Sequence, residues 1–329
     1  MGASRPGNSA TGAGLALLSA ATFGTSGSFA TSLLDAGWSP NAVVIARVSI
    51  AAALLAVPTA VALRRSSATL RASTAPTLTY GVAAIGGAQV CFFNAVKYVP
   101  VGVALLLEYL GIALVVGWMW LRHRQPPRPL TVAGMAVVLV GLSFVLNLFG
   151  SAHVNVLGVL WGLGAAVGLA IYFVLSAHSS DRLPPIAMAG VGLAVGAVAL
   201  LAVGALGILP LHATFGTVRL VNHQMSWLVP IAGLSVLAAA IAYVAGIHAA
   251  RRLGPKLSSF VGLTEVLFAV VFAWVLLDQL PSLEQGIGAV LIITGIVLVR
   301  LDESEQVSGQ PMDLAESVGT ASELAVESA

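Results

Sequence analysis

The stretch "VALLLEYLGIALVVGWMWL", residues 103–121, is almost entirely apolar over 19 residues, yet it contains a glutamate, Glu108. A helix of about 20 residues crosses the roughly 30 Å of bilayer hydrocarbon, so this run predicts a membrane span. A charged residue near the centre of a span costs about 2.5–3.5 kcal/mol or more, and such residues usually mark functional sites. A second run, "FVGLTEVLFAVVFAWVLL" at 260–277, places Glu265 in a similar setting. The two glutamates are therefore the first candidates for a site inside the membrane.

Composition places the whole chain in the membrane. Of its 329 residues 58% are hydrophobic and only 9% are charged, whereas a soluble domain carries about 25% charged residues. The mean hydropathy is +0.97. We predict an all-α polytopic membrane protein with ten transmembrane helices. The ten apolar runs lie at about 12–33, 40–62, 77–98, 101–121, 129–149, 156–177, 185–209, 226–249, 256–278 and 284–300.

Positive charge predicts the orientation of these spans, because cytoplasmic loops carry an excess of Lys and Arg. With the N-terminus in the cytoplasm, twelve of the 15 basic residues fall in cytoplasmic segments. Two, Lys97 and Arg219, fall at external ends, and the remaining one, Arg47, lies inside a span. We therefore expect a multi-pass protein of a bacterial-type plasma (inner) membrane with both termini in the cytoplasm. Residues 1–11 form a cytoplasmic tail, and the acidic residues 302–329 form a disordered one.

The chain also repeats itself. The matching residues are Gly134 with Gly288 and Gly141 with Gly295, both 154 apart, together with Glu108 and Glu265, 157 apart, and Pro40 and Pro185, 145 apart. They predict two five-helix repeats at 12–149 and 156–301. An odd number of spans in each repeat inserts the two in opposite orientations, which is the inverted-repeat plan of secondary transporters. We expect the runs 129–149 and 284–300 to pack outside a central space formed by the other eight.

Several quoted segments resemble the EamA family of the drug/metabolite transporter superfamily. They are Ser39-Pro40 followed by Arg47, "KYVPVGVALLLEYLG" (97–111), "LGPKLSSFVGLTEVLFA" (253–269) and "LLDQLPSLEQGIGAVLIITGIVLV" (276–299). The resemblance covers most of the chain and implies ten spans in two inverted repeats and the outward transport of small metabolites. Within the family, "LLLEYLG" resembles the branch that exports threonine, homoserine and related amino acids. Arg47 has no counterpart in the second repeat. The offset of 145 residues between Pro40 and Pro185 maps Arg47 onto Gly192, and no basic residue stands near that position.

Arg47, Glu108 and Glu265 are the main candidates for a substrate or proton site. At about 1.5 Å per residue they lie about 10, 12 and 14 Å deep in their spans, so all are near mid-membrane. One interpretation is a zwitterion site in which Glu108 faces an ammonium group or carries a proton while Arg47 faces a carboxylate. The alternative is a structural ion pair between Arg47 and Glu108. Glu265 has no evident cation at its depth, which suits a proton carrier or a neutral contact between helices.

Further candidate contacts are Lys97, Asn94, Gln89, Tyr172 and Tyr243, with packing or snorkelling as the alternative for each. Tyr109 follows Glu108 directly and points about 100° away from it on a helix. We interpret the small polar cluster "TFGTSGSFATS" (22–32) as a packing face, since a helix satisfies Ser and Thr on its own backbone.

No catalytic, phosphate-binding or metal-binding motif is present in the sequence, so we expect neither an enzyme nor a cofactor or metal. The predicted function is secondary active transport, as a proton-coupled exporter of a small organic metabolite such as an amino acid. An organic-cation drug or a sugar derivative is the alternative solute, and an intramembrane enzyme or receptor is the remote one. The expected partners are the substrate and the lipid bilayer, with no nucleic acid. The sequence leaves a homodimer open.

Overall fold

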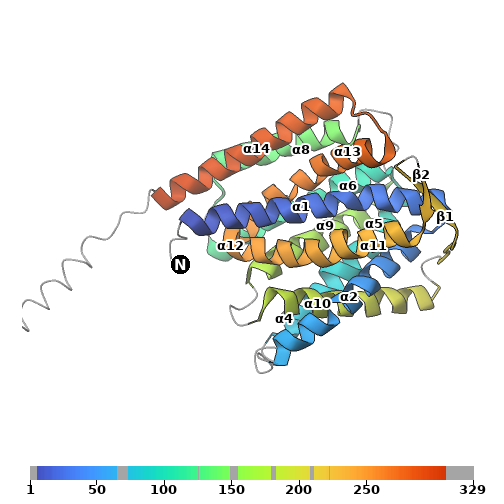
Figure 1. The fold of residues 1–329 in the computed structure, drawn as a ribbon. Coiled ribbons are helices and arrows are strands. Elements are labelled where there is room, and N and C mark those ends of the chain that lie inside the picture. The colour runs from blue at the N-terminus through green and yellow to red at the C-terminus, as the bar shows by residue number, and fades with distance from the viewer. Residues whose placement is uncertain are drawn as a thin grey trace, which may run out of the picture.

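The computed structural model describes residues 6–64, 73–124, 126–148, 155–178, 183–207, 211–221 and 223–308. Its helices run side by side across the molecule (Figure 1). The first half of the chain forms α1 (Pro6–Asp35), α2 (Pro40–Arg64), α4 (Thr74–Thr79), the π-helix η1 (Tyr80–Gly87), α5 (Ala88–Val96), α6 (Val101–Tyr109), α7 (Gly111–His123) and α8 (Pro129–Val145). The second half forms α9 (Val156–His178), α10 (Pro185–Ala205), β1 (Thr217–Leu220), β2 (His223–Ser226), α11 (Leu228–Ser235), the π-helix η2 (Val236–Ile241), α12 (Ala242–Gly262), α13 (Thr264–Leu277) and α14 (Leu283–Ser308).

The prediction of an all-α polytopic membrane protein is confirmed. Within the described residues, seven helical segments are long and apolar enough to cross a membrane. All ten predicted runs fall on helices, but the count of ten spans is not confirmed. The helices α1, α8 and α13 do not meet both conditions: α1 has 30 residues but is less apolar, while α8 with 17 residues and α13 with 14 are shorter than the roughly 20 residues that a span needs.

The break between the predicted runs 226–249 and 256–278 lies elsewhere than expected. Helical structure continues from Leu228 to Gly262 and changes direction at Gly254, whose φ is +79°. Glycine adopts this conformation readily, and the proline that follows it disfavours a helical residue in front of it. A second break at Leu263 separates α12 from α13, directly before Glu265.

A short β-hairpin, which the sequence did not lead us to expect, occupies the connection between α10 and α11. Strands β1 and β2 pair antiparallel, with Thr217 opposite Ser226 and Leu220 opposite His223. Val218 and Leu220 are buried while their neighbours are exposed, so the alternation of a half-buried strand is present over only four residues. The hairpin lies at the right-hand end of the bundle in Figure 1.

Helices α8 and α14 pack closely against each other on one side of the bundle, as Figure 1 shows. A Cβ atom on Gly141 would lie 2.8 Å from the carbonyl oxygen of Gly288, so only glycine allows the two backbones to approach this far. The two helices contribute only Val145, Leu146 and Gln285, at or next to their ends, to the cavities described below. The expectation that these two runs pack outside a central space is therefore met, but the run 185–209, expected to help form that space, contributes no residue to either cavity.

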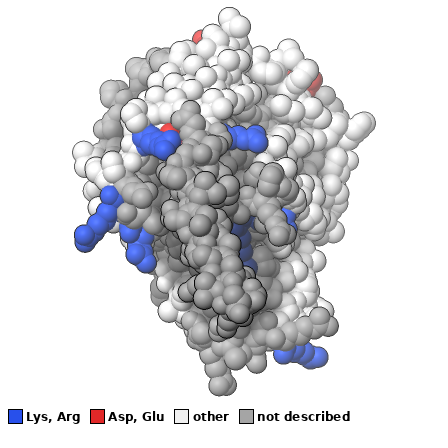
Figure 2. Space-filling view, turned by 90° about the vertical axis from the view of Figure 1, so that its left-hand side faces the viewer, with Lys and Arg blue, Asp and Glu red and all other residues white. Residues whose placement is uncertain are grey.

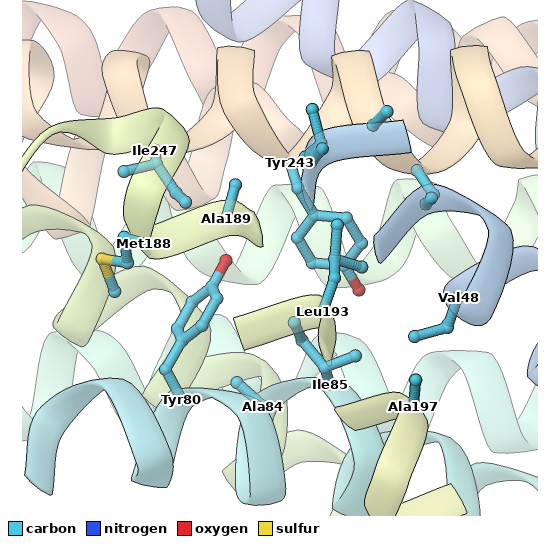
Figure 3. Packing of buried hydrophobic residues seen from close by; sticks show 14 of the residues in the cluster. Val48, Tyr80, Ala84, Ile85, Met188, Ala189, Leu193, Ala197, Tyr243 and Ile247 are labelled. Carbon is cyan, nitrogen blue, oxygen red and sulfur yellow. The ribbon is translucent and has the colours of Figure 1, made fainter. Parts of the chain in front are cut away.

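The main hydrophobic core interlocks the two halves of the chain. Helix η1 packs against α9 and α10 of the second half, and η2 packs against α1 and α2 of the first. Figure 3 shows Tyr80, Ile85 and Leu193 together with Val48 and Tyr243 in this core. Each half therefore inserts a π-helical segment between the first two helices of the other.

The end of the molecule where α1 begins and α14 ends is rich in basic residues. Figure 2 looks onto this end and shows Lys and Arg on it, with little Asp or Glu among the described residues. Helix α14 continues past the apolar run to Ser308, so the first residues of the predicted acidic tail are helical. The rest of that tail, 309–329, and residues 1–5 lie outside the described residues.

Candidate functional site

A cavity of about 240 Å³ lies among helices from both halves of the chain. Six of the eight residues proposed from the sequence line it: Arg47, Gln89, Glu108, Tyr172, Tyr243 and Glu265. They come from α2, α5, α6, α9, α12 and α13, so residues up to 218 positions apart meet at one place. The fold thus gathers the charged residues of the spans around one internal space.

Arg47 is the cation of this site. It follows the first two turns of α2, is only 9% exposed, and donates a 3.0 Å hydrogen bond from Nη1 to Oγ of Ser26 on α1. Its guanidinium carbon lies 5.9 Å from the ring centroid of Phe23, which is within the range of a cation–π contact. Nε of Arg47 is buried and has no hydrogen-bond partner among the described residues. Arg47 therefore lines the cavity, while its Nε is shielded from the open space.

Both glutamates lie at a break between two helices. Glu108 comes just before the turn at Leu110 that separates α6 from α7, and Glu265 lies in the first turn of α13. The free N–H groups of a helix N-terminus carry partial positive charge, which favours a carboxylate at the position of Glu265. The break thus gives Glu265 a favourable setting that does not depend on a neighbouring basic side chain.

The charge of Arg47 acts on both carboxyl groups, but it contacts neither in this conformation. In the part of the chain that the structure describes, Glu108 and Glu265 form no ion pair and no side-chain hydrogen bond. The alternative of a structural Arg47–Glu108 ion pair is therefore not realised here. Three ionisable side chains that face one cavity without pairing to each other can instead interact with a bound ligand.

Aromatic side chains form one wall of the cavity. The rings of Phe23 and Tyr243 meet edge to face at 5.1 Å, and Tyr172 contacts Tyr243 at 5.8 Å in the same way. The Tyr172 hydroxyl and Ser19 Oγ both lie where a Cβ atom on Gly246 would stand, so this glycine leaves the room for them. These contacts fix the aromatic wall by direct packing between α1, α9 and α12.

Two of the proposed residues do not reach the site. Asn94 donates from Nδ2 to the carbonyl oxygen of Val90 in its own helix at 2.8 Å, and its Oδ1 accepts a 2.9 Å hydrogen bond from Lys97 Nζ. Lys97 is exposed, and neither residue lines either cavity. Both lie at the end of α5 without lining the cavities, and the exposed lysine reaches water there.

A second cavity of about 750 Å³ shares Arg47, Gln89 and Glu265 with the first. Its lining includes Val101 and Leu280, which are 52% and 78% exposed, so it reaches the surface at the end of the bundle that carries the hairpin. Toward the opposite end, Ala16 and Ala249 line the smaller cavity and belong to an apolar cluster with Val261, against which Leu15, Leu253 and Leu257 pack. The larger cavity therefore reaches the surface at one end of the protein, and an apolar cluster lies toward the other.

The sequence interpretation missed several lining residues. Part of the cluster at 22–32 faces the larger cavity rather than a packed helix: Ser26, Gly27, Ser28 and Thr31. Thr22, Thr25 and Ser32 do bond to their own helix, as expected. Tyr109 lines both cavities, because it lies four residues after Leu105 on α6, and Leu105 lines both as well. Small residues recurring three or four positions apart, as at 24, 27, 28 and 31, were the available signal.

Comparisons with known proteins agree with this architecture. The model of the EamA-like transporter family matches the chain twice, at residues 10–147 and 156–301. The chain is 22% identical to the uncharacterized inner membrane transporter YicL of Salmonella typhimurium, over 65% of the chain and 69% of YicL. It is 30% identical to the threonine/homoserine exporter RhtA of Escherichia coli, but over only 40% of the chain and 42% of RhtA. One solved crystal structure, 22% identical in sequence, superposes with a TM-score of 0.69 over 91% of this chain and 98% of the other, so the fold is shared.

Proposed function

We propose that this chain, which belongs to the EamA-like transporter family, is a proton-coupled secondary transporter that exports a small organic metabolite, with an amino acid as the best-matched substrate. The observation that carries the proposal is the single cavity that Arg47, Glu108 and Glu265 line from both halves of the chain. The name of one relative, the threonine/homoserine exporter RhtA, supports the direction and the substrate class, although the match spans less than half of that protein.

The charges of the cavity suit a zwitterion. Arg47 lines the cavity and offers a planar guanidinium, which matches a carboxylate group. Glu108 and Glu265, which line the same cavity, offer acceptors for an ammonium group. A zwitterion would satisfy both kinds of group at once, and this is the charge pattern of a free amino acid.

Proton coupling follows from competition for one carboxyl group. A glutamate inside a span is costly as a lone anion, so in the absence of substrate it is better held with a proton than without one. A substrate ammonium group that binds at Glu108 then displaces that proton, and a proton that returns displaces the substrate. Because the two cations compete for one site, a proton gradient would drive the substrate in the opposite direction.

We further propose the membrane arrangement predicted from the sequence. The ten helical runs form ten spans in two inverted repeats, at 12–149 and 156–301, in a bacterial-type inner membrane. The basic end of Figure 2, where α1 begins, faces the cytoplasm by the positive-inside rule. The larger cavity then opens to the outside, and this conformation is the outward-facing state of an alternating-access cycle.

An organic cation is a second candidate substrate. Two carboxyl groups face only one guanidinium in the cavity, and Phe23, Phe92 and Tyr109 supply aromatic surface that attracts cations. Arg47 separates the two candidates, because a zwitterion needs it and a cation does not.

Flux into proteoliposomes tests the proposal. Amino acids, organic cations and sugar derivatives are offered with and without an imposed pH gradient, to the wild type, to Arg47→Ala and to Arg300→Ala, which changes an exposed arginine of α14. We expect gradient-dependent uptake of an amino acid that Arg47→Ala abolishes and Arg300→Ala retains. Uptake of cations alone, unaffected by Arg47→Ala, would support the second candidate. Absence of any gradient-dependent flux would reject both.

A further inference from the structure

The two π-helices occupy equivalent places in the two halves of the chain. In η1 the N–H of Ala88 donates to the carbonyl oxygen of Ala83, and in η2 the N–H of Ala242 donates to that of Leu237. The two donor residues are 154 residues apart, and so are the two acceptor residues. The same offset relates Gly134 to Gly288. Well under 1% of residues in proteins are π-helical, and such turns occur mostly at functional sites. A π turn at equivalent positions of both repeats is therefore a feature of the fold and not an isolated irregularity.

The first π turn changes the direction of Gln89. Residues four apart share a face of a regular α-helix, so Gln89 would continue the face of Gly81 and Ile85. That face packs against α10: a Cβ atom on Gly81 would lie 2.6 Å from Cβ of Val195, and Ile85 is completely buried. The π turn adds one residue, which rotates all later residues by about 100°.

The consequence of that rotation is visible in the contacts. Val90, one position further along, packs into the core formed with α10 in place of Gln89. Gln89 itself lines both cavities.

The second π turn stands directly before Tyr243. Ala239 is completely buried, and Tyr243 belongs to the same core cluster. Tyr243 also lines the smaller cavity, with its ring 5.1 Å from that of Phe23. Gln89 and Tyr243 are also 154 residues apart, so each is the residue next after the π bond of its own repeat.

Gln89 offers unused hydrogen bonds at the cavity. In the described part of the chain its side chain makes no hydrogen bond, although an amide can donate two and accept two. We propose that the first π turn directs Gln89 into the cavity, and that Gln89 and Tyr243 together determine substrate specificity there. Gln89 hydrogen-bonds a hydroxyl or amide group on the substrate's side chain, and the Tyr243 ring packs against the same group. This inference rests on the proposed function and specifies it: the substrate is an amino acid with a polar, uncharged side chain.

Threonine and valine have nearly the same shape and differ in one hydroxyl group, so they test the role of Gln89 directly. A site built to bond a hydroxyl group discriminates against the analogue that lacks it. In proteoliposomes we expect the wild type to prefer threonine in kcat/KM by about tenfold or more. Gln89→Met should remove this preference while valine transport continues. Asn94→Met is the matched control, because it removes an amide from the same helix outside the cavity, and it should keep the preference.

A second variant tests the π turn itself. A Cβ atom on Gly87 would lie 3.0 Å from the carbonyl oxygen of Val82, so Gly87→Ala crowds the π turn and favours a regular helix. We expect it to lose the threonine preference as Gln89→Met does. Gly117→Ala, made where no atom lies within 4 Å, should retain it.

The outcomes separate this inference from the proposed function. Amino-acid flux without a threonine preference, or with a preference that survives Gln89→Met, overturns the inference and leaves the transporter intact. Absence of amino-acid flux in the wild type overturns the proposed substrate and this inference with it. Loss of the preference in Gln89→Met but not in Gly87→Ala rejects the role of the π turn.

Discussion

Gly134 of α8 and Gly295 of α14 lie so close together that a Cβ atom on Gly134 would stand 2.8 Å from the carbonyl oxygen of Gly295. Gly141 and Gly288 repeat this contact further along the pair. Gly134 is equivalent to Gly288 in the 154-residue repeat, and Gly295 is equivalent to Gly141. The contact between Gly134 and Gly295 is therefore equivalent to the contact between Gly288 and Gly141. Two contacts that exchange in this way are expected of repeats related by a two-fold axis, and they support the inverted arrangement that we propose.

We predict that Gly134→Ala destabilises the protein. The added carbon meets the backbone of α14, which cannot move aside as a flexible side chain can, and overpacking of this kind costs about 1–3 kcal/mol. Gly286→Ala is the matched control on α14, since no atom lies within 4 Å of its added carbon. Thermal unfolding in detergent micelles measures both variants. Equal unfolding temperatures for the two would show that the α8–α14 contact is looser than described.

The sequence predicted the helices, which follow from the lengths of the apolar runs, and the repeats, which follow from the spacing of matching residues. The runs of 17 to 25 residues appear as helices because hydrocarbon demands that length and an internally bonded backbone. The charged site was predictable because Arg47, Glu108 and Glu265 are unusual inside spans. Their meeting around one cavity was inferred from depth alone, and the structure places them there.

The features that depend on local backbone geometry were not predictable. A π turn adds one residue to a helix without a distinctive sequence, so the orientation of Gln89 differs from that on an ideal helix. Small polar residues on α1 bond to their own backbone or face a cavity with equal ease, so Ser26 gave no clear sequence signal.

We predict that Gly246→Ala reduces transport more than it reduces stability. The added methyl group would clash with the Tyr172 hydroxyl and stand 2.9 Å from Ser19 Oγ. The Tyr172 hydroxyl is the far end of a side chain that can rotate away from the added methyl group. Because Tyr172 lines the cavity, this rotation would move its ring into the space for the substrate. We expect a higher KM for larger substrates, measured as flux across a series of amino acids of increasing size. Gly14→Ala, on α1 with no atom within 4 Å of the added carbon, should leave the series unchanged. An unaltered size dependence in Gly246→Ala would show that Tyr172 does not limit the cavity.

We predict that Asp302→Ala is strongly destabilising. Asp302 is 2% exposed, accepts a hydrogen bond from the hydroxyl of Thr131, and lies 3.4 Å from Lys256 Nζ. Its loss leaves a largely buried ammonium group and a buried hydroxyl without this acceptor, and breaking such a buried pair costs about 3–5 kcal/mol. Glu284→Ala removes an exposed carboxylate from the other end of α14 and should cost little. Unfolding in detergent compares the two, and similar losses would mean that the contact among α8, α12 and α14 is not stabilising.

We predict that Glu108→Gln uncouples transport from the proton gradient. Glu108→Gln keeps the shape and the hydrogen-bonding capacity of the side chain but can neither release a proton nor bear a negative charge. Since Glu108 makes no ion pair or side-chain hydrogen bond among the described residues, the exchange leaves no buried partner behind, and folding should be nearly unchanged. We expect transport driven by a pH gradient to be lost, while exchange of labelled for unlabelled substrate continues without a gradient. Glu284→Gln, which changes an exposed carboxylate, should behave as the wild type. If Glu108→Gln still responds fully to the gradient and Glu265→Gln does not, the proton is carried by Glu265, and Glu108 only binds the substrate.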